Sequence, residues 1–128
     1  MSDFKTLLAV GDMVQPGVVT IAATQTVKNG AITMSEKNSS SLLVIDGGGK
    51  LIGIVTESDI VRRAVGKGLD VSAATIGDIM SPDPVSINHD ESIFEARNTM
   101  TAKKLGHLIV VKDGKPLGVL TSQTVLGA

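Results

Sequence analysis

The sequence contains no cysteine, no tryptophan and no tyrosine, and only two phenylalanines among its 128 residues. The absence of cysteine excludes disulfide bonds, thiolate metal ligands and cysteine nucleophiles. The scarcity of aromatic side chains leaves no platform on which the bases of single-stranded nucleic acid would stack. A net charge of -1 and a pI near 6.1 give no electrostatic footprint for DNA or RNA. We therefore expect no nucleic-acid partner.

The N-terminal residues carry an acidic side chain early, at Asp3, and only a very short apolar run. This pattern matches neither a secretory signal nor a membrane span. The sequence therefore predicts a soluble, cytoplasmic protein with no membrane partner. A chain of 128 residues forms one compact domain or two half-size units that share an interface.

The most informative positive feature of the chain is an internal repeat. An offset of 66 residues maps Met34 onto Met100, and after a glycine turn at 47–49 an offset of 65 maps Gly53 onto Gly118. The same offsets relate further pairs: Gly11-Asp12 with Gly77-Asp78, Pro16 with Pro82, Leu42 with Leu108, and Thr56 with Thr121. Self-similarity at a fixed period indicates one folding unit used twice. Two such units packed face to face create a cleft, which is where function is to be sought.

Each copy is predicted to follow the order β-α-β-β-α, which gives a fold of the α/β (α+β) class. The first repeat spans residues 8–66, a linker spans 67–75, and the second repeat spans 76–128. In the second copy the closing helix is expected to be nearly absent, because little sequence follows the last strand.

Local signals support these elements. Ser92 and Glu95 form a capping-box pattern before the main helix of the second copy, and Thr26 stands at the equivalent cap in the first. In each copy two apolar runs flank a glycine-containing turn, and Asp113-Gly114 between β-rich runs is a strong hairpin signal.

The most specific string is Gly-Ile-Val-Thr-Glu-Ser-Asp at residues 53–59, where a predicted strand runs into a helix. A helix start offers unpaired N–H groups and a positive dipole end, which suits a phosphate. The hydroxyls of Thr56 and Ser58 can add donors, and Asp59 can accept from two neighbouring hydroxyls, as a ribose diol presents them. The same Thr56-x-x-Asp59 spacing is also a capping-box pattern that merely starts a helix. On the string alone, capping is favoured.

Within a repeated β-α-β-β-α unit that opens on Gly-Asp, this string closely resembles the CBS domain, named after cystathionine β-synthase. Residues 53–59 satisfy the family motif, Gly-hydrophobic-x-Ser/Thr-x-x-Asp/Asn, at every position. The resemblance covers about residues 8–127 and leads us to expect a stand-alone tandem CBS pair with no catalytic domain. It implies two repeats packed as a pseudo-twofold pair through their sheets. In this family the clefts between repeats commonly bind AMP, ADP, ATP, NAD or S-adenosylmethionine.

The resemblance also implies roles for individual residues. Asp59 would hold the ribose, Thr56 and Ser58 would face its phosphate side, and Ile54 would line the base. The remaining positions that it assigns to the ligand are Ser41 in the first copy and, on a facing wall supplied by the second copy, Pro82, Leu105, Gly106 and His107. Ser41 corresponds to His107, and a histidine that begins an apolar strand is as readily a structural residue as a ligand contact.

The second copy departs from the motif. Thr124 stands where the acid belongs, and a single hydroxyl cannot grip a diol as a carboxylate does. We therefore expect one competent nucleotide site and one weakened or silent site, marked by Thr121, Gln123 and Thr124.

Other polar clusters are given structural interpretations. His89-Asp90-Glu91 is predicted to be a solvated turn and not a metal site, because no second histidine or cysteine accompanies it. Arg62 and Arg63 are predicted to lie on a solvated helix face. We expect no metal and no obligatory cofactor.

Three functions compete. The first is a regulatory sensor that binds an AMP-, ADP- or ATP-like nucleotide between the repeats and modulates an unidentified partner protein. S-adenosylmethionine and NAD are alternative ligands for the same site. The second is a ligand-independent dimerisation scaffold, since the resemblance also implies a homodimer. The third, an enzyme, is weak because no catalytic triad is recognisable. Thr56 and Asp59 favour the sensor, whereas Thr124 favours the scaffold.

Overall fold

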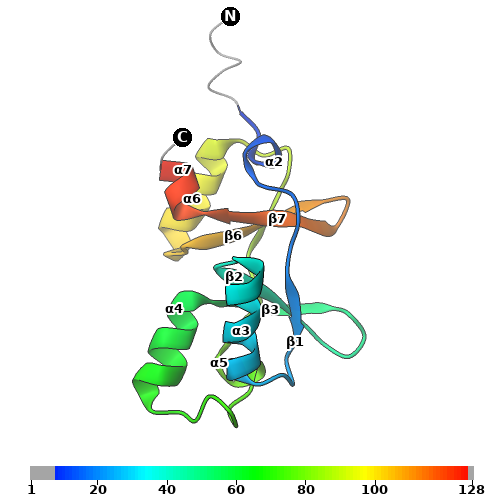
Figure 1. Cartoon of the computed structure of the whole chain (residues 1–128). Helices are drawn as coiled ribbons and strands as arrows, with labels where there is room; N and C mark the ends of the chain where they lie inside the picture. Colours follow the sequence, from blue (N-terminus) through cyan, green and yellow to red (C-terminus); the bar gives the residue numbers. More distant parts are fainter. Residues whose placement is uncertain (1–7, 127–128) are drawn as a thin grey trace, which may run out of the picture. The chain divides into compact units, whose positions relative to one another are not determined.

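The computed structural model describes residues 8–126 of the chain (Figure 1). Expectations for residues 1–7 and 127–128, including that of the N-terminal segment, lie outside this range. The chain divides into two compact units. One is Val19–Pro84, and the other combines residues 8–18 with residues 85–126. We call them the 19–84 unit and the 85–126 unit, and the second name includes residues 8–18.

The 19–84 unit contains a sheet in the order β1-β2-β3-β4, in which β1 is parallel to β2 and the other neighbours are antiparallel. Its elements are β1 (Thr20–Ala22), α3 (Val27–Lys37), β2 (Ser41–Ile45), β3 (Leu51–Thr56), α4 (Glu57–Asp59), the π-helical turn η1 (Ile60–Ala64), the 3-10 turn η2 (Val65–Lys67), α5 (Ile76–Ile79) and β4 (Ser81–Pro82).

The 85–126 unit contains a sheet in the order β5-β6-β7, with β5 parallel to β6 and β6 antiparallel to β7. In Figure 1, α6 and α7 lie together on one side of the β6–β7 hairpin. Its elements are α2 (Val10–Met13), β5 (Ser86–Asn88), α6 (Ile93–Lys103), β6 (His107–Lys112), β7 (Lys115–Thr121) and α7 (Ser122–Leu126).

The predicted mixed α/β class and the repeated β-α-β-β-α order are confirmed. The caps follow the sequence signals, because the Thr26 hydroxyl accepts the Asn29 N–H at 3.1 Å and the Ser92 hydroxyl accepts the Glu95 N–H at 3.2 Å. The closing helix of the second copy is short, ending at Leu126 within the described residues.

The two hairpins turn as the glycine signals predict. Asp113 and Gly114 have φ angles of 52° and 77°, which is the pair of positive values that a two-residue hairpin turn requires. The longer turn of the first copy places the positive φ, 84°, at Gly49.

Each unit has its own apolar core, and each core includes side chains from the opening segment of the other repeat. In the 19–84 unit the main helix and sheet bury the following residues together with Ile76 and Ile79 of α5: Ile21, Val27, Met34, Leu42, Val44, Val55 and Ala64. In the 85–126 unit the equivalent set packs with Val10 and Val14: Ile87, Ile93, Ala96, Met100, Leu108, Val110, Leu120 and Val125.

The repeats of the sequence and the compact units of the structure therefore divide the chain differently. Residues 76–84, which open the second repeat, supply α5 and β4 to the unit formed by the first repeat. Residues 8–18 supply α2 to the other unit, where the Gly17 N–H donates to the Leu117 carbonyl at 2.9 Å. Residues 67–75 also belong to the 19–84 unit, and the Val71 carbonyl accepts the Lys28 N–H at 2.9 Å.

The motif glycines allow these opening segments to lie against the sheet. A Cβ at Gly118 would stand 2.5 Å from the Gln15 carbonyl oxygen and 2.7 Å from the Val14 side chain. A Cβ at Gly53 would stand 2.5 Å from the Met80 sulfur and 2.9 Å from the Ser81 carbonyl oxygen. Glycine at this position of the motif is thus explained by the close approach of two backbones.

We expect Gly118→Ala to lower the free energy of unfolding by about 2 kcal/mol, because the new methyl group overlaps backbone that cannot easily move. Gly53→Ala should cost less, since the nearest atom belongs to the flexible Met80 side chain. The nearest backbone atom there, the Ser81 carbonyl oxygen, is 2.9 Å away, against 2.5 Å for the Gln15 oxygen at Gly118. Gly47→Ala is the control, because nothing lies within 4 Å of a Cβ there. Urea denaturation measures all three, and equal losses for Gly118→Ala and Gly47→Ala would contradict the packing role.

Asp46 organises the first hairpin turn. Its Oδ1 accepts the N–H groups of Lys50 and Gly48, each at 2.9 Å. These hydrogen bonds lower the pKa of the Asp46 carboxyl from the ordinary aspartate value. The bond from Lys50 has the larger effect, and the bond from Gly48 comes next.

A lowered folded-state pKa means that the charged form favours the folded turn. The contribution of Asp46 to turn stability should be fully present above the ordinary aspartate pKa of about 3.9 and should disappear as the pH falls through the lower folded value. NMR titration of the Gly48 and Lys50 amide shifts follows this directly. A midpoint at or above the ordinary value would contradict the assignment.

Candidate functional site

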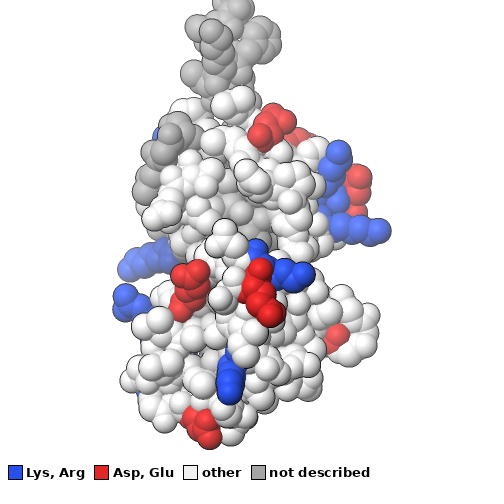
Figure 2. Space-filling model, viewed as in Figure 1, with Lys and Arg blue, Asp and Glu red and all other residues white. Residues whose placement is uncertain are grey.

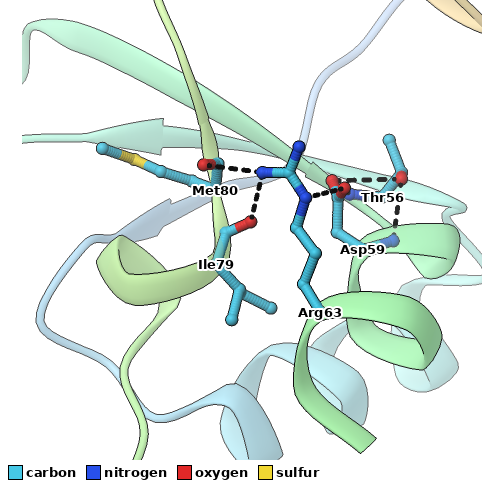
Figure 3. Close-up of polar contacts among 5 residues, drawn as sticks. All are labelled: Thr56, Asp59, Arg63, Ile79 and Met80. Atoms are coloured by element: carbon cyan, nitrogen blue, oxygen red, sulfur yellow. Dashed lines mark hydrogen bonds and ion pairs between the residues drawn. The ribbon is translucent and has the colours of Figure 1, made fainter. Parts of the chain in front are cut away.

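Thr56 and Asp59 form a reciprocal capping box at the end of β3 (Figure 3). The Asp59 Oδ2 accepts the Thr56 N–H at 2.9 Å and the Thr56 hydroxyl at 3.2 Å. The Asp59 N–H donates in return to the Thr56 Oγ1 at 3.3 Å. The sequence offered capping and ligand binding as alternatives for this spacing, and the capping contacts are present. They also fix the carboxylate in one orientation.

Arg63 is the residue that the sequence interpretation missed. It was assigned to a solvated helix face, but its Nε lies 3.5 Å from the Asp59 Oδ1, with the Arg63 side chain 51% exposed and that of Asp59 15% exposed. Its Nη1 donates to the carbonyls of Ile79, at 3.3 Å, and Met80, at 3.4 Å. The spacing of four residues from Asp59 was the available signal, because such positions are neighbours on a helix.

Other predicted residues of the first repeat gather on the same sheet. Ser41 on β2 pairs in register with Thr56 on β3 and is buried, and Ile54 lies two residues earlier on β3. Ser58 is exposed on α4.

The expected place of Pro82 was wrong. It was assigned to a facing wall, but the structure places it on β4, opposite Gly53 in the same sheet as Ile54. The physical reason is that the opening segment of the second repeat adds a strand to the unit of the first.

The second motif lies in the 85–126 unit, together with Leu105, Gly106 and His107. His107 pairs in register with Thr121, as Ser41 does with Thr56, and the Gly106 carbonyl accepts the Ser122 N–H at 2.9 Å. The Thr121 and Thr124 hydroxyls lie 3.1 Å apart, and the Thr124 N–H donates to the Thr121 Oγ1 at 3.2 Å. Gln123 is exposed. The helix therefore starts without an acid at the position of Thr124.

The helical segment that follows Thr56, formed by α4 and η1, is called the motif helix. Beside it, the 19–84 unit has a groove of about 580 Å3 between α3 and residues 57–61. Its lining is partly apolar and partly polar: Ala31, Met34, Ser35, Asn38, Ser39, Ser40, Glu57, Ile60 and Val61. The corresponding groove of the other unit has about 130 Å3 and is lined in part by Arg97, which stands where the first repeat has Ala31 and donates to the Val125 carbonyl at 3.2 Å.

On the face in Figure 2, acidic and basic side chains of the described residues are interspersed. Within residues 8–126, the structure contains no cluster of three or more His, Asp or Glu side chains able to hold a metal ion. Every helix in that range falls short of the length and apolarity needed to cross a membrane.

The sequence matches the profile of the CBS domain twice, over residues 10–66 and 76–128. The chain belongs to the CBS-domain family. The two matches make it a tandem CBS pair, as the resemblance of the motif and repeat had implied.

Similar proteins extend this assignment. An uncharacterized protein of Methanopyrus kandleri is 31% identical over 120 residues, which are 93% of this chain and 61% of that protein. This chain spans less than two thirds of the length of the curated relatives that it matches first.

Among solved structures, a CBS-domain protein of Burkholderia ambifaria assigned to signal transduction has a TM-score of 0.83 and 27% identity, with 94% of this chain and 91% of that chain covered. A hexameric CBS-CP12 protein from bloom-forming cyanobacteria has a TM-score of 0.87 and 25% identity, covering 94% of this chain and 67% of that one. The chain is thus a tandem CBS pair with the fold of these structures.

We expect Asp59→Ala to lower the free energy of unfolding by about 1–2 kcal/mol, because both the capping box and the Arg63 ion pair are lost. The matched control is Asp78→Ala, since the Asp78 Oδ2 accepts the Thr75 N–H at 2.9 Å in a second capping box of the same unit. That variant loses the cap alone and should cost about 1 kcal/mol. Chemical denaturation of both variants measures the difference, and a smaller loss for Asp59→Ala would contradict the added contribution of Arg63.

Proposed function

We propose that this CBS pair is a regulatory module that binds an adenosine-containing nucleotide, of the AMP, ADP or ATP type, through Asp59. The observation that carries the proposal is the orientation of the Asp59 carboxylate. Thr56 holds it from one side and Arg63 from the other, and the side chain still keeps 15% of its surface exposed. A carboxylate has about four acceptor positions, and the Thr56 N–H, the Thr56 hydroxyl and the Arg63 guanidinium occupy three of them. One position is left for a ribose hydroxyl, and a second becomes available when the Thr56 hydroxyl turns away from the carboxylate.

A carboxylate that is already fixed loses little conformational freedom when a ligand binds, which favours affinity. Around it, the exposed Ser58 hydroxyl offers a donor for the phosphate side, and the Thr56 hydroxyl offers one once it turns away from the Asp59 Oδ2. Ile54 offers an apolar surface for the base. Ser41 and Pro82 complete the set in the same unit. That Leu105, Gly106 and His107 also contact the ligand stays a prediction from the resemblance.

The scarcity of aromatic residues shapes the expected selectivity. With two phenylalanines in the chain, an adenine would lie against aliphatic side chains such as Ile54. The proposal therefore includes modest affinity and competition among related nucleotides, with NAD and S-adenosylmethionine as further competitors. The ligand would act by shifting the population of conformations that a partner protein recognises. We take the module to be non-catalytic and cytoplasmic, with no obligatory cofactor.

A second candidate function is a ligand-independent scaffold that associates with itself. Large apolar side chains on its helices favour this: Val61 and Val65 are each 62% exposed, and Phe94 on α6 is 52% exposed. The cyanobacterial CBS-CP12 protein is hexameric. The threonine at position 124 also favours the scaffold, because it weakens the second nucleotide motif.

We expect AMP, ADP or ATP to bind the protein in isothermal titration calorimetry with about one site per chain, and Asp59→Ala to abolish the binding. Thr124→Ala should leave the affinity within about twofold, because Thr124 belongs to the second motif, where a single hydroxyl replaces the carboxylate that we expect to hold the ribose. Asp78→Ala is the matched control for lost capping and should also bind normally.

The outcome separates the two candidates. Binding lost in Thr124→Ala and retained in Asp59→Ala would contradict the assignment of the site. The scaffold would be the supported function if two results came together. Calorimetry would show no heat of binding with any adenine nucleotide, NAD or S-adenosylmethionine, and light scattering would show a stable oligomer.

A further inference from the structure

Arg63 joins two segments of the 19–84 unit that are distant in sequence (Figure 3). One is the motif, contacted through the Asp59 Oδ1 at 3.5 Å. The other is the end of α5, contacted through the Ile79 and Met80 carbonyls at 3.3 and 3.4 Å. Figure 3 shows the guanidinium lying between these acceptors, with Thr56 beyond the carboxylate.

The chemistry of the two contacts suits arginine. The last carbonyls of a helix have no partner within it, and a cation near them is also favoured by the helix dipole. A guanidinium is a planar fork with five donors, so it can bond a carboxylate on one edge and carbonyls on another. Each contact is long for a hydrogen bond and partly exposed, so the orientation of the guanidinium depends on both partners together.

The second repeat lacks both members of the ion pair. Thr124 replaces Asp59, and the offset of 65 residues that relates them also relates Arg63 to Ala128. The positions that correspond to Ile79 and Met80 are Met13 and Val14, at the end of α2. Both repeats have the short opening helix, α2 or α5, but only the repeat with the motif aspartate has the arginine.

We propose that Arg63 is a positioning residue that couples the Asp59 carboxylate to the Ile79–Pro82 stretch. The charge and orientation of the carboxylate hold the guanidinium, and the guanidinium holds the end of α5 and the start of β4. A ligand that bonds to the carboxylate removes the small freedom that the capping box and Arg63 leave to it. This tightens the Ile79–Pro82 stretch, since less orientational freedom is then left for Arg63 to lose. The last statement rests on the proposed function, whereas the coupling itself does not.

The Ile79–Pro82 stretch is well placed to respond to a change at the Asp59 carboxylate. Its Met80 side chain packs next to Gly53, and Ser81 and Pro82 pair with β3. After Pro84 the chain leaves this unit and continues into the 85–126 unit. The proposed coupling therefore reaches one of the two places where the chain passes between the units, the other being between Val18 and Val19.

Amide hydrogen exchange of Met80 tests the coupling without any ligand. Its N–H donates to the Ile76 carbonyl at 2.9 Å, so its exchange reports the closing of α5. We expect Arg63→Gln and Asp59→Asn each to raise the opening of this amide about threefold, the scale of a partly exposed ion pair. The double variant should also show about threefold, because both changes break one chain of contacts. Asn retains an acceptor for the Thr56 N–H, so the cap of α4 persists.

Asp46→Asn is the control for losing a carboxylate in the same unit, and it should leave Met80 unchanged. An effect of Arg63→Gln without one of Asp59→Asn would make Arg63 a simple cap of α5 and overturn the proposal. A double variant near ninefold, which is the product of independent effects, would overturn it as well.

Saturating AMP provides the second arm. It should slow Met80 exchange in the unaltered protein and not in Arg63→Gln, and slowing in both would overturn the transmission through Arg63. If calorimetry shows that the unaltered protein binds no nucleotide, the proposed function fails, and the comparison of the four unliganded proteins still decides the coupling.

Discussion

The close approach of two backbones at the motif glycine is the constraint on which both units depend. Gly118 and Gly53 leave room for an opening segment that comes from the other repeat, and this segment carries core residues with it. Val10 and Val14 enter one core, and Ile76 enters the other. Because neither repeat contains its whole core, neither should be stable alone, and the two must fold as a pair.

The same exchange brings the candidate site and the connecting segment together. β4 adds to β3 beside Ile54, so the strand that leads into Thr56 is flanked by residues of the second repeat. Arg63 then reaches from the motif helix to the carbonyls that precede β4. In the coupling that we propose, a change at the Asp59 carboxylate reaches residues 79–82, which belong to the second repeat, within a single compact unit.

Local features of this fold could be predicted from the sequence, because neighbouring residues decide them. The caps at Thr26 and Ser92 and the Asp113-Gly114 hairpin are of this kind. The exchange of opening segments could not be predicted, since Val10 and Ile76 are related by the repeat offset and fit either core equally well. Arg63 was assigned to solvent because its carbonyl partners lie 16 and 17 residues away, beyond any local pattern. Roles in ligand binding at Asp59 and His107 stay predictions.

The comparison of the repeats separates what the fold requires from what it does not. Thr121 and Thr124 start α7 with hydroxyl and amide contacts alone, so this turn does not require a carboxylate. Asp59 satisfies the same turn more fully and in addition attracts Arg63. Since the carboxylate and the arginine occur together in one repeat and are both replaced in the other, capping alone does not account for them. The Asp59–Arg63 pair is thus an addition to the turn at the end of one strand, and ligand binding at Asp59 is the role that we propose for it.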